Sequence, residues 1–142
     1  MERDELMTLL PHRGSMLLLD RASVEDGAAR GERLIRGDEF FLDGHFPGNP
    51  IVPGVILCEI LAQSACVLIG KTGGAVTTLF TGLDKVRFKN TVKPGDLFQT
   101  ECRITRQKGV FYWAEGRGTV SGRLCVSAEF SFAVIPEEGG NG

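Results

Sequence analysis

The segment Val55-Ile-Leu-Cys-Glu-Ile-Leu-Ala-Gln-Ser-Ala-Cys-Val-Leu-Ile69 is the most apolar stretch of this chain. Its apolar residues occupy almost every side of a helix, a pattern that predicts a helix buried all round. Pro53 suits a first helical turn but not a helix interior, and Gly70 with Gly73-Gly74 supplies a stop. The sequence therefore predicts a central helix of about 17 residues and roughly 25 Å, long enough to cross a small domain.

The remainder of the chain has the composition and spacing of β-strands. Runs of β-branched and aromatic residues are expected to form strands at residues 16–24, 28–36, 76–89, 96–106, 110–120 and 124–134. Turn-forming residues separate these runs, among them Asp26-Gly27, Lys93-Pro-Gly-Asp96 and Ser121-Gly122. Short turns between successive strands require antiparallel pairing, because parallel neighbours need long crossovers. We therefore expect an α+β fold, with a long central helix wrapped by a meandering, five- to six-stranded antiparallel sheet.

The size of the chain indicates one domain. A length of 142 residues is typical of a single domain, which we expect to span residues 1–136 and to include a short helix at Asp4–Leu10. Residues 137–142 are expected to form a flexible tail. One sheet cannot cover every side of the central helix, so the leftover apolar surface predicts a dimer.

The composition argues against several classes of protein. A net charge of −2 and a pI near 5.7 disfavour a nucleic-acid binder that depends on bulk positive charge. The acidic N-terminus predicts no signal peptide, and Glu59 and Gln63 argue against membrane insertion of the apolar helix, so we expect a cytoplasmic protein. The spacing of the cysteines fits neither a Cys-x-x-Cys pair nor a metal site with the histidines, which predicts reduced core cysteines at Cys58, Cys66, Cys102 and Cys125.

The most informative polar residue is Glu59, in the middle of the apolar segment. An ionised carboxylate among hydrocarbon is costly, so Glu59 is expected to be paired, protonated or used in chemistry. Fourteen residues upstream, His45 lies on a loop rich in Gly and Pro and titrates near neutrality. Gln63 follows Glu59 by one helical turn and can hydrogen-bond the carboxyl group or a ligand. Desolvation should raise the pKa of Glu59 and favour the protonated form that a general acid requires.

Structural interpretations of these residues remain open. His45 can be a loop histidine bonded to backbone, which is also what we expect of His12. The Glu59 carboxylate can be satisfied by an arginine or by buried water, although no basic residue lies within a turn of it.

Two further features are candidates for ligand binding. The Gly54 N–H opens the central helix without an intrahelical acceptor, and it can stabilise negative charge on a carbonyl oxygen. A plain Pro-Gly helix start is the simpler interpretation of Gly54. On a strand, three cations share one face and can receive a phosphate or an acidic partner, or they form a solvated surface; they are Lys85, Arg87 and Lys89.

Motifs occur in a fixed order along nearly the whole chain: Leu10-Pro-His-Arg13, Leu17-Leu-Leu-Asp-Arg21, Gly44-His-Phe-Pro-Gly48, Pro53-Gly-Val55, Glu59, Ala62-Gln63, Gly82-Leu-Asp-Lys-Val-Arg-Phe-Lys89 and Pro94-Gly-Asp96. Together they resemble the 3-hydroxyacyl-acyl carrier protein dehydratases of bacterial type II fatty acid synthesis. The most specific of these motifs is the His-Phe-Pro-Gly segment with an acid fourteen residues after the histidine. Arg13-Gly-Ser-Met16 departs from the aromatic-proline stretch that is common in the family.

The resemblance implies a hot-dog fold, with homodimers that form a continuous sheet and often assemble further as a trimer of dimers. In that family the active sites lie at the dimer interface, where the histidine of one subunit faces the acid of the other. Carried over to this chain, His45 is the general base, Glu59 is the general acid, Gly54 N–H polarises the thioester carbonyl and Gln63 supports the acid. A glutamate at the acid position favours a simple dehydratase over the dehydratase/isomerase branch, which usually carries aspartate.

The resemblance also implies the substrate and partner. The substrate is a (3R)-3-hydroxyacyl group on the phosphopantetheine of an acyl carrier protein, and neither a metal nor an organic cofactor of the enzyme is implied. The cationic residues would meet the phosphate or the acidic carrier; they are Lys85, Arg87 and Lys89. Two alternatives stay open, an acyl thioesterase of the same fold and a catalytically silent subunit that binds acyl carriers.

Overall fold

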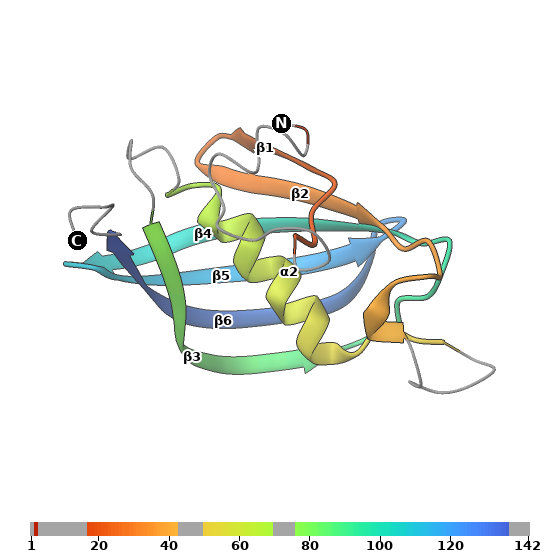
Figure 1. The fold of residues 1–142 in the computed structure, drawn as a ribbon. Helices are drawn as coiled ribbons and strands as arrows, with labels where there is room; N and C mark the ends of the chain where they lie inside the picture. Colours follow the sequence, from red (N-terminus) through yellow and green to blue (C-terminus); the bar gives the residue numbers. More distant parts are fainter. Residues whose placement is uncertain (1, 3–16, 43–49, 70–75, 137–142) are drawn as a thin grey trace.

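In the part of the chain that the structure describes, one α-helix lies across one face of a six-stranded antiparallel sheet (Figure 1). The structure is a computed structural model, and it describes residue 2 and residues 17–42, 50–69 and 76–136. Its elements are β1 (Arg21–Glu25), β2 (Ala28–Leu34), the 3-10 helix η2 (Phe40–Leu42), α2 (Gly54–Cys66), β3 (Val76–Phe88), β4 (Leu97–Lys108), β5 (Phe111–Val120) and β6 (Arg123–Pro136). The expected α+β class is confirmed. The short helix expected at residues 4–10, His12 and the tail at 137–142 lie outside the described residues.

Local turn signals predicted two of the hairpins correctly. Asp26 and Gly27 join β1 to β2 with φ angles of 52° and 76°. Ser121 and Gly122 join β5 to β6 with φ angles of 51° and 79°. Two residues with positive φ give a turn whose twist matches the flanking strands, which is why these pairs form tight hairpins.

The prediction that successive strands pair throughout is wrong for β3 and β4. The strand order is β1-β2-β4-β5-β6-β3, so β3 pairs with β6 at the edge of the sheet and β4 pairs with β2. The turn at Lys93–Asp96 is real, since Asp96 N donates to Lys93 O at 3.0 Å. It follows a segment that crosses the end of the sheet, where Val92 is fully buried and its carbonyl accepts Val52 N–H at 2.8 Å. The crossing is long enough to separate the two strands.

Two predicted boundaries also need correction. The first strand begins at Arg21 rather than at residue 16, because Leu18 N donates to the Gln63 side chain at 2.9 Å instead of to a strand. The helix ends at Cys66 rather than near residue 69. The next three residues continue as a tight turn, in which each N–H donates to the carbonyl three residues earlier at 3.0–3.2 Å.

The helix is fixed to the sheet by apolar packing and by a small polar cluster. Ser64 Oγ and Thr100 Oγ1 lie 2.6 Å apart, and Gly31 N donates to Thr100 Oγ1 at 3.1 Å. This cluster ties α2 to β4 and β2 in the buried interior, where satisfied polar groups specify one arrangement. All four cysteines are buried free thiols, as the sequence predicted.

Small residues on β5 allow the neighbouring strand to pack its large side chains over them. A Cβ atom at Gly118 would overlap the ring of Phe98, which is fully buried. We therefore expect Gly118→Ala to lower the free energy of unfolding by about 1–3 kcal/mol through overpacking. Urea denaturation would measure this change.

The edge strand β3 carries the apolar surface that α2 leaves uncovered. The helix packs on β4, β5, β2 and β6. Phe80, Leu83 and Phe88 pair with residues of β6 that face the core, yet they are 47–55% exposed. The leftover apolar surface expected from the sequence is therefore present, and it lies along the free edge of the sheet (Figure 1). No helix among the described residues is long and apolar enough to cross a bilayer.

Candidate active site

The candidate site includes the N-terminal end of α2. Pro53 is the N-cap residue and Gly54 is the first helical residue, within one position of the expected start. The first N–H groups of a helix have no intrahelical acceptor and form its positive end. A Cβ atom at Gly54 would lie 2.6 Å from Cζ of Phe88, so a glycine is required for this ring to approach the helix end. The sequence did not predict this contact, because it joins two segments far apart in the chain.

Glu59 lies in the same helix, flanked by buried Cys58 and Ile60. Burial raises the pKa of the Glu59 carboxyl from its ordinary value of 4.5 to about 7. The carboxyl group is therefore about half protonated at neutral pH and can donate a proton there. This agrees with the shift expected from the apolar composition of the segment.

Gln63 lies one turn beyond Glu59 and is fully buried. Its Oε1 atom accepts the Leu18 N–H at 2.9 Å, which fixes the orientation of the amide. The sequence placed Gln63 on the face of the helix that carries Glu59 but did not predict its partner Leu18. The support of Glu59 by Gln63 stays a prediction.

His45 lies outside the described residues, but the chain on both sides of its segment is described. Before it, η2 ends with Phe41 and Leu42, which are both 7% exposed. After it, Val52 is buried and hydrogen-bonded to Val92, and it leads directly into α2. The described residues on both sides of the His45 segment are thus buried, and those that follow it lead into the helix of Glu59.

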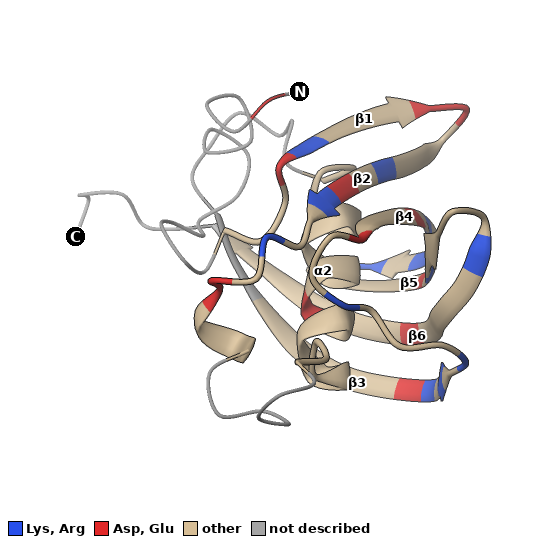
Figure 2. Cartoon of the chain, turned by 90° about the vertical axis from the view of Figure 1, so that its right-hand side faces the viewer, with Lys and Arg blue, Asp and Glu red and all other residues tan. Residues whose placement is uncertain are grey.

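Two of the three candidate cations line a hollow of about 510 Å³ on the sheet face opposite α2. Lys85 and Arg87 lie there, and a bulge between Asp84 and Arg87 interrupts the regular alternation that the sequence predicted. Lys85 Nζ is 3.4 Å from Glu129, and the hollow mixes cations and carboxylates, as do the strands in Figure 2. Lys89 follows the end of β3, next to Phe88. It therefore lies nearer to the N-terminal end of α2 than the bulge does.

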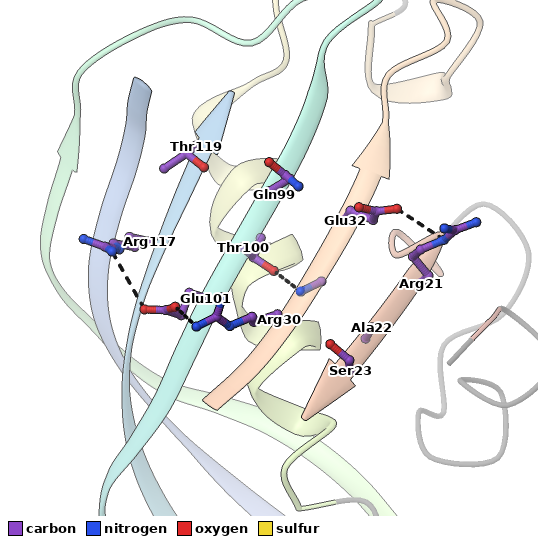
Figure 3. A pocket seen from close by; sticks show the side chains of 11 residues that line it. Arg21, Ala22, Ser23, Arg30, Glu32, Gln99, Thr100, Glu101, Arg117 and Thr119 are labelled. Atoms are coloured by element: carbon purple, nitrogen blue, oxygen red, sulfur yellow. Dashed lines mark hydrogen bonds and ion pairs between the residues drawn. The ribbon is translucent and has the colours of Figure 1, made fainter. Parts of the chain in front are cut away.

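A second hollow, of about 360 Å³, crosses β1, β2, β4 and β5 on the same outer face (Figure 3). Its charged side chains pair with one another. Arg30 lies 3.1 Å and Arg117 lies 3.8 Å from the Glu101 carboxylate, and Arg21 lies 3.2 Å from Glu32. These ion pairs are partly exposed, so we interpret this hollow as a solvated sheet surface rather than a catalytic centre.

The chain is similar to known proteins in both sequence and fold. Residues 10–129 match the family model of the FabA-like domain. A relative from Chloroflexus aggregans, named 3-hydroxyacyl-acyl carrier protein dehydratase FabZ, is 42% identical over 135 residues, covering 92% of this chain and 93% of the relative. The protein of the same name from Bacillus subtilis is 37% identical over 138 residues, covering 94% of this chain and 98% of the relative.

Solved structures share the fold at lower identity. The dehydratase heterocomplex ApeI:P from Xenorhabdus doucetiae matches with a TM-score of 0.79 and 21% identity, covering 93% of this chain and 91% of that chain. A hypothetical thioesterase with coenzyme A from Streptococcus pneumoniae matches with a TM-score of 0.63 and 17% identity, covering 82% and 85% of the two chains. These structures show that dehydratases and proteins described as thioesterases share this architecture, the hot-dog fold.

Proposed function

This chain belongs to the FabA-like family and is a dehydratase of the FabZ type, and from this we propose that it converts (3R)-3-hydroxyacyl-acyl carrier protein to the trans-2-enoyl product in fatty acid synthesis. The observation that supports this proposal best is the Glu59 carboxyl, whose pKa burial raises to about 7. A group that holds its proton at neutral pH can deliver it to a leaving hydroxyl. The reaction uses no metal or organic cofactor beyond the phosphopantetheine that the substrate carries.

The proposed chemistry divides among three residues. His45 removes the proton on C2, and the Gly54 N–H stabilises the charge that develops on the thioester oxygen. Protonated Glu59 gives its proton to the C3 hydroxyl, so that the C3–O bond breaks, water leaves and the C2–C3 double bond forms. Gly54 and Glu59 belong to one rigid helix, which holds the oxyanion donor and the acid at a constant separation.

The proposed assembly is a homodimer that pairs its edge strands. An edge strand with exposed apolar side chains is a template for pairing with another chain. Along β3 these side chains are Phe80, Leu83 and Phe88, on the helix side of the sheet. Pairing of two β3 strands would cover them and would bring the His45 segment of one subunit toward Glu59 of the other. A trimer of such dimers is the larger assembly that the family implies.

The partner that we propose is the acyl carrier protein. Lys89 lies beside Phe88, whose ring contacts the Gly54 end of α2, so it is the cation best placed for the phosphopantetheine phosphate. Lys85 and Arg87 lie on the outer face among carboxylates, which reduces the field that they present to an acidic carrier.

The direct test is an assay of 3-hydroxyacyl carrier substrate with detection of the enoyl product by mass spectrometry. We expect product from the wild-type protein and a loss of about 100-fold or more in His45→Ala. Release of free acid in place of enoyl product would show a thioesterase. Absence of both products from a folded, oligomeric protein would show a silent subunit.

We also expect Gly54→Ala to lower kcat/KM by about 100-fold. The added Cβ atom would occupy the space in front of the helix end and displace the Phe88 ring. Because pairing of the β3 strands would cover this ring, we expect the thermal stability of the oligomer to fall as well. Steady-state kinetics and thermal unfolding would measure the two effects. Gly54→Ala/Phe88→Leu relieves the contact with the ring, and recovery of activity in this double variant would show that close approach to Gly54 is not required.

A further inference from the structure

A buried ion pair lies at the turn that leads from β2 toward the His45 segment. Arg33 is the last inward-facing residue of β2, and its side chain is 10% exposed. Its Nη2 donates to Glu39 Oε2 at 3.0 Å, and the Glu39 side chain is 5% exposed. Burying two charges is costly, so a pair of this kind is weak support for stability by itself. Stability alone therefore does not explain why this ion pair occurs at the turn.

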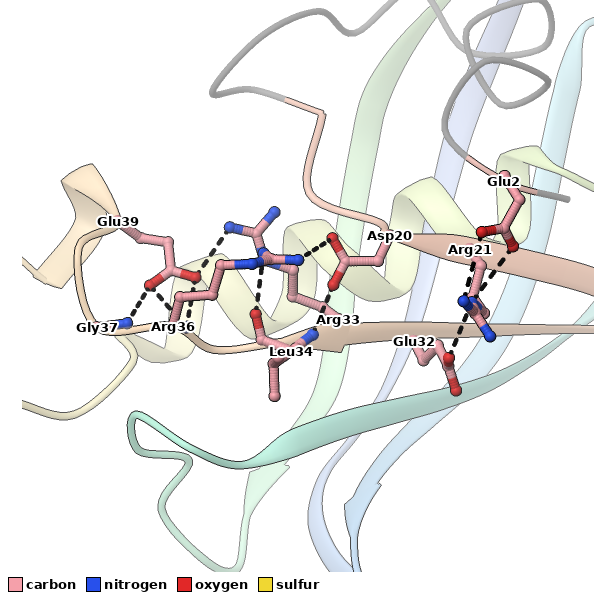
Figure 4. Close-up of polar contacts among 9 residues, drawn as sticks. All are labelled: Glu2, Asp20, Arg21, Glu32, Arg33, Leu34, Arg36, Gly37 and Glu39. Atoms are coloured by element: carbon pink, nitrogen blue, oxygen red, sulfur yellow. Dashed lines mark hydrogen bonds and ion pairs between the residues drawn. The ribbon is translucent and has the colours of Figure 1, made fainter.

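The Glu39 carboxylate closes the turn through backbone N–H groups (Figure 4). It accepts the N–H of Arg36 at 2.9 Å and that of Gly37 at 2.8 Å, in addition to Arg33. Burial raises the pKa of Glu39, but these hydrogen bonds outweigh that effect and hold its pKa below the ordinary value. Glu39 is therefore an ionised clamp on the turn.

The turn is also tied to the residues just before β1 and β4. Asp20 accepts the Leu34 N–H at 2.7 Å and Arg36 Nη2 at 3.0 Å. Ile35 exchanges backbone hydrogen bonds with Gly95 and Asp96 at 2.7 Å and 3.0 Å. The turn is thus held from both neighbouring segments, and Figure 4 shows the bonds of Asp20 to Leu34 and Arg36.

The clamp determines where the chain enters the His45 segment. Leu42 N donates to Glu39 O at 3.1 Å, and Leu42 is buried at the end of η2. His45 follows Leu42 by three residues, which span at most about 11 Å when extended, so the chain that leads to His45 starts from the position of Leu42. The N–H groups of Arg36 and Gly37 are exposed and could bond to water instead. What the carboxylate adds is a defined geometry.

We propose that Glu39, held by Arg33 and the turn that it closes, is a positioning residue for the His45 base; this inference rests on the proposed function. Glu39 does not touch the substrate. It acts by placing the chain from which the base extends. A displacement of about 1 Å in a reacting group can cost about 100-fold in rate, so loss of the clamp affects turnover more than binding.

The test compares Glu39→Gln with Glu32→Gln in the intact oligomer. Glu32 lies on β2 beside Arg33, in a partly exposed ion pair with Arg21 on the outer face, and its variant is the matched control. We expect Glu39→Gln to lower kcat by about 30-fold with KM changed by less than about threefold, and Glu32→Gln to leave both near wild type. A kcat for Glu39→Gln within about twofold of the control would overturn the proposal.

A second variant separates positioning from folding. Arg33→Met/Glu39→Met replaces the buried pair with apolar side chains, which commonly restores stability. We expect thermal stability near that of the control with kcat still low, and this variant also decides the matter if Glu39→Gln does not fold. Recovery of kcat together with stability would assign Glu39 a structural role only.

His45→Ala is measured alongside these variants. If His45→Ala is inactive and Glu39→Gln is normal, the positioning role fails and the proposed function stands. If His45→Ala is active, the general base is wrong and the positioning role fails with it.

Discussion

Replacing Glu59 by glutamine is expected to lower kcat by about 1,000-fold and, at the same time, to make the folded protein more stable at pH 8. Glutamine keeps the size and polarity of the side chain but cannot deliver a proton to the C3 hydroxyl. The loss of activity tests the acid role, and the gain in stability tests the cost of burial. Few surface substitutions would produce both effects.

The sign of the stability effect follows from the pKa of Glu59. Burial raises this pKa from 4.5 to about 7, so the folded state binds the proton more tightly than the unfolded state. The stabilising effect of the proton is complete below pH 4.5 and is lost as the pH rises to 7. Above that range the wild type carries a deficit of up to about 3 kcal/mol, which Glu59→Gln does not share.

Urea denaturation at pH 4.5 and pH 8, with kinetics on the same samples, would measure both effects. We expect the two proteins to be close in stability at the lower pH and to separate at the higher. Glu32→Gln removes a carboxylate from a partly exposed ion pair and serves as the control at both pH values. Retention of activity within about tenfold of wild type would remove Glu59 from the general-acid role. A stability difference that did not vary with pH would contradict the raised pKa.

The same pKa predicts the alkaline limb of the activity. Above about pH 7 the protonated fraction of Glu59 falls, and kcat/KM should fall about tenfold for each further pH unit. A pH profile of the wild type would show this limb, and a profile that stays level to pH 9 would contradict it.

The features that the sequence predicted well depend on local chemistry. Pro53 and Gly54 begin the helix, and Asp26-Gly27 makes a tight hairpin, because backbone preferences of adjacent residues decide these structures. The raised pKa of Glu59 also follows from its neighbours in one helix. Each of these inferences needs only a few consecutive residues.

The features that the sequence did not predict depend on distant contacts. The Pro-Gly turn before β4 does not reveal whether β4 pairs with the strand that precedes it in the chain. It does not, because β3 occupies the edge position beside β6 and the chain crosses the end of the sheet before β4 begins. The contact of Phe88 with Gly54 and the bond from Leu18 to Gln63 likewise join separate segments. The pair of Arg33 and Glu39 has no local signal, because a charged residue at the end of a strand is usually exposed.

A mixture of two inactive variants is expected to recover about a quarter of the wild-type activity if each site joins two subunits in a symmetric dimer. The variants are His45→Ala and Glu59→Gln. About half of randomly formed dimers are mixed, and in each mixed dimer one of the two sites receives an intact His45 from one subunit and an intact Glu59 from the other. The second site in the same dimer carries both substitutions.

The exchange requires that subunits dissociate and pair again, so the two variants are unfolded together in urea and refolded. Leu83 is 49% exposed on the helix side of β3, and Leu83→Lys in both variants should block the pairing of edge strands by placing charges in the interface. We expect recovery of activity only in the mixture without Leu83→Lys. A mixture that refolds to dimers but stays inactive would show that His45 and Glu59 of one subunit act together. In that case the pairing of β3 strands would still account for the dimer. The apolar surroundings of Glu59 would then have to accommodate His45 and Glu59 of the same chain.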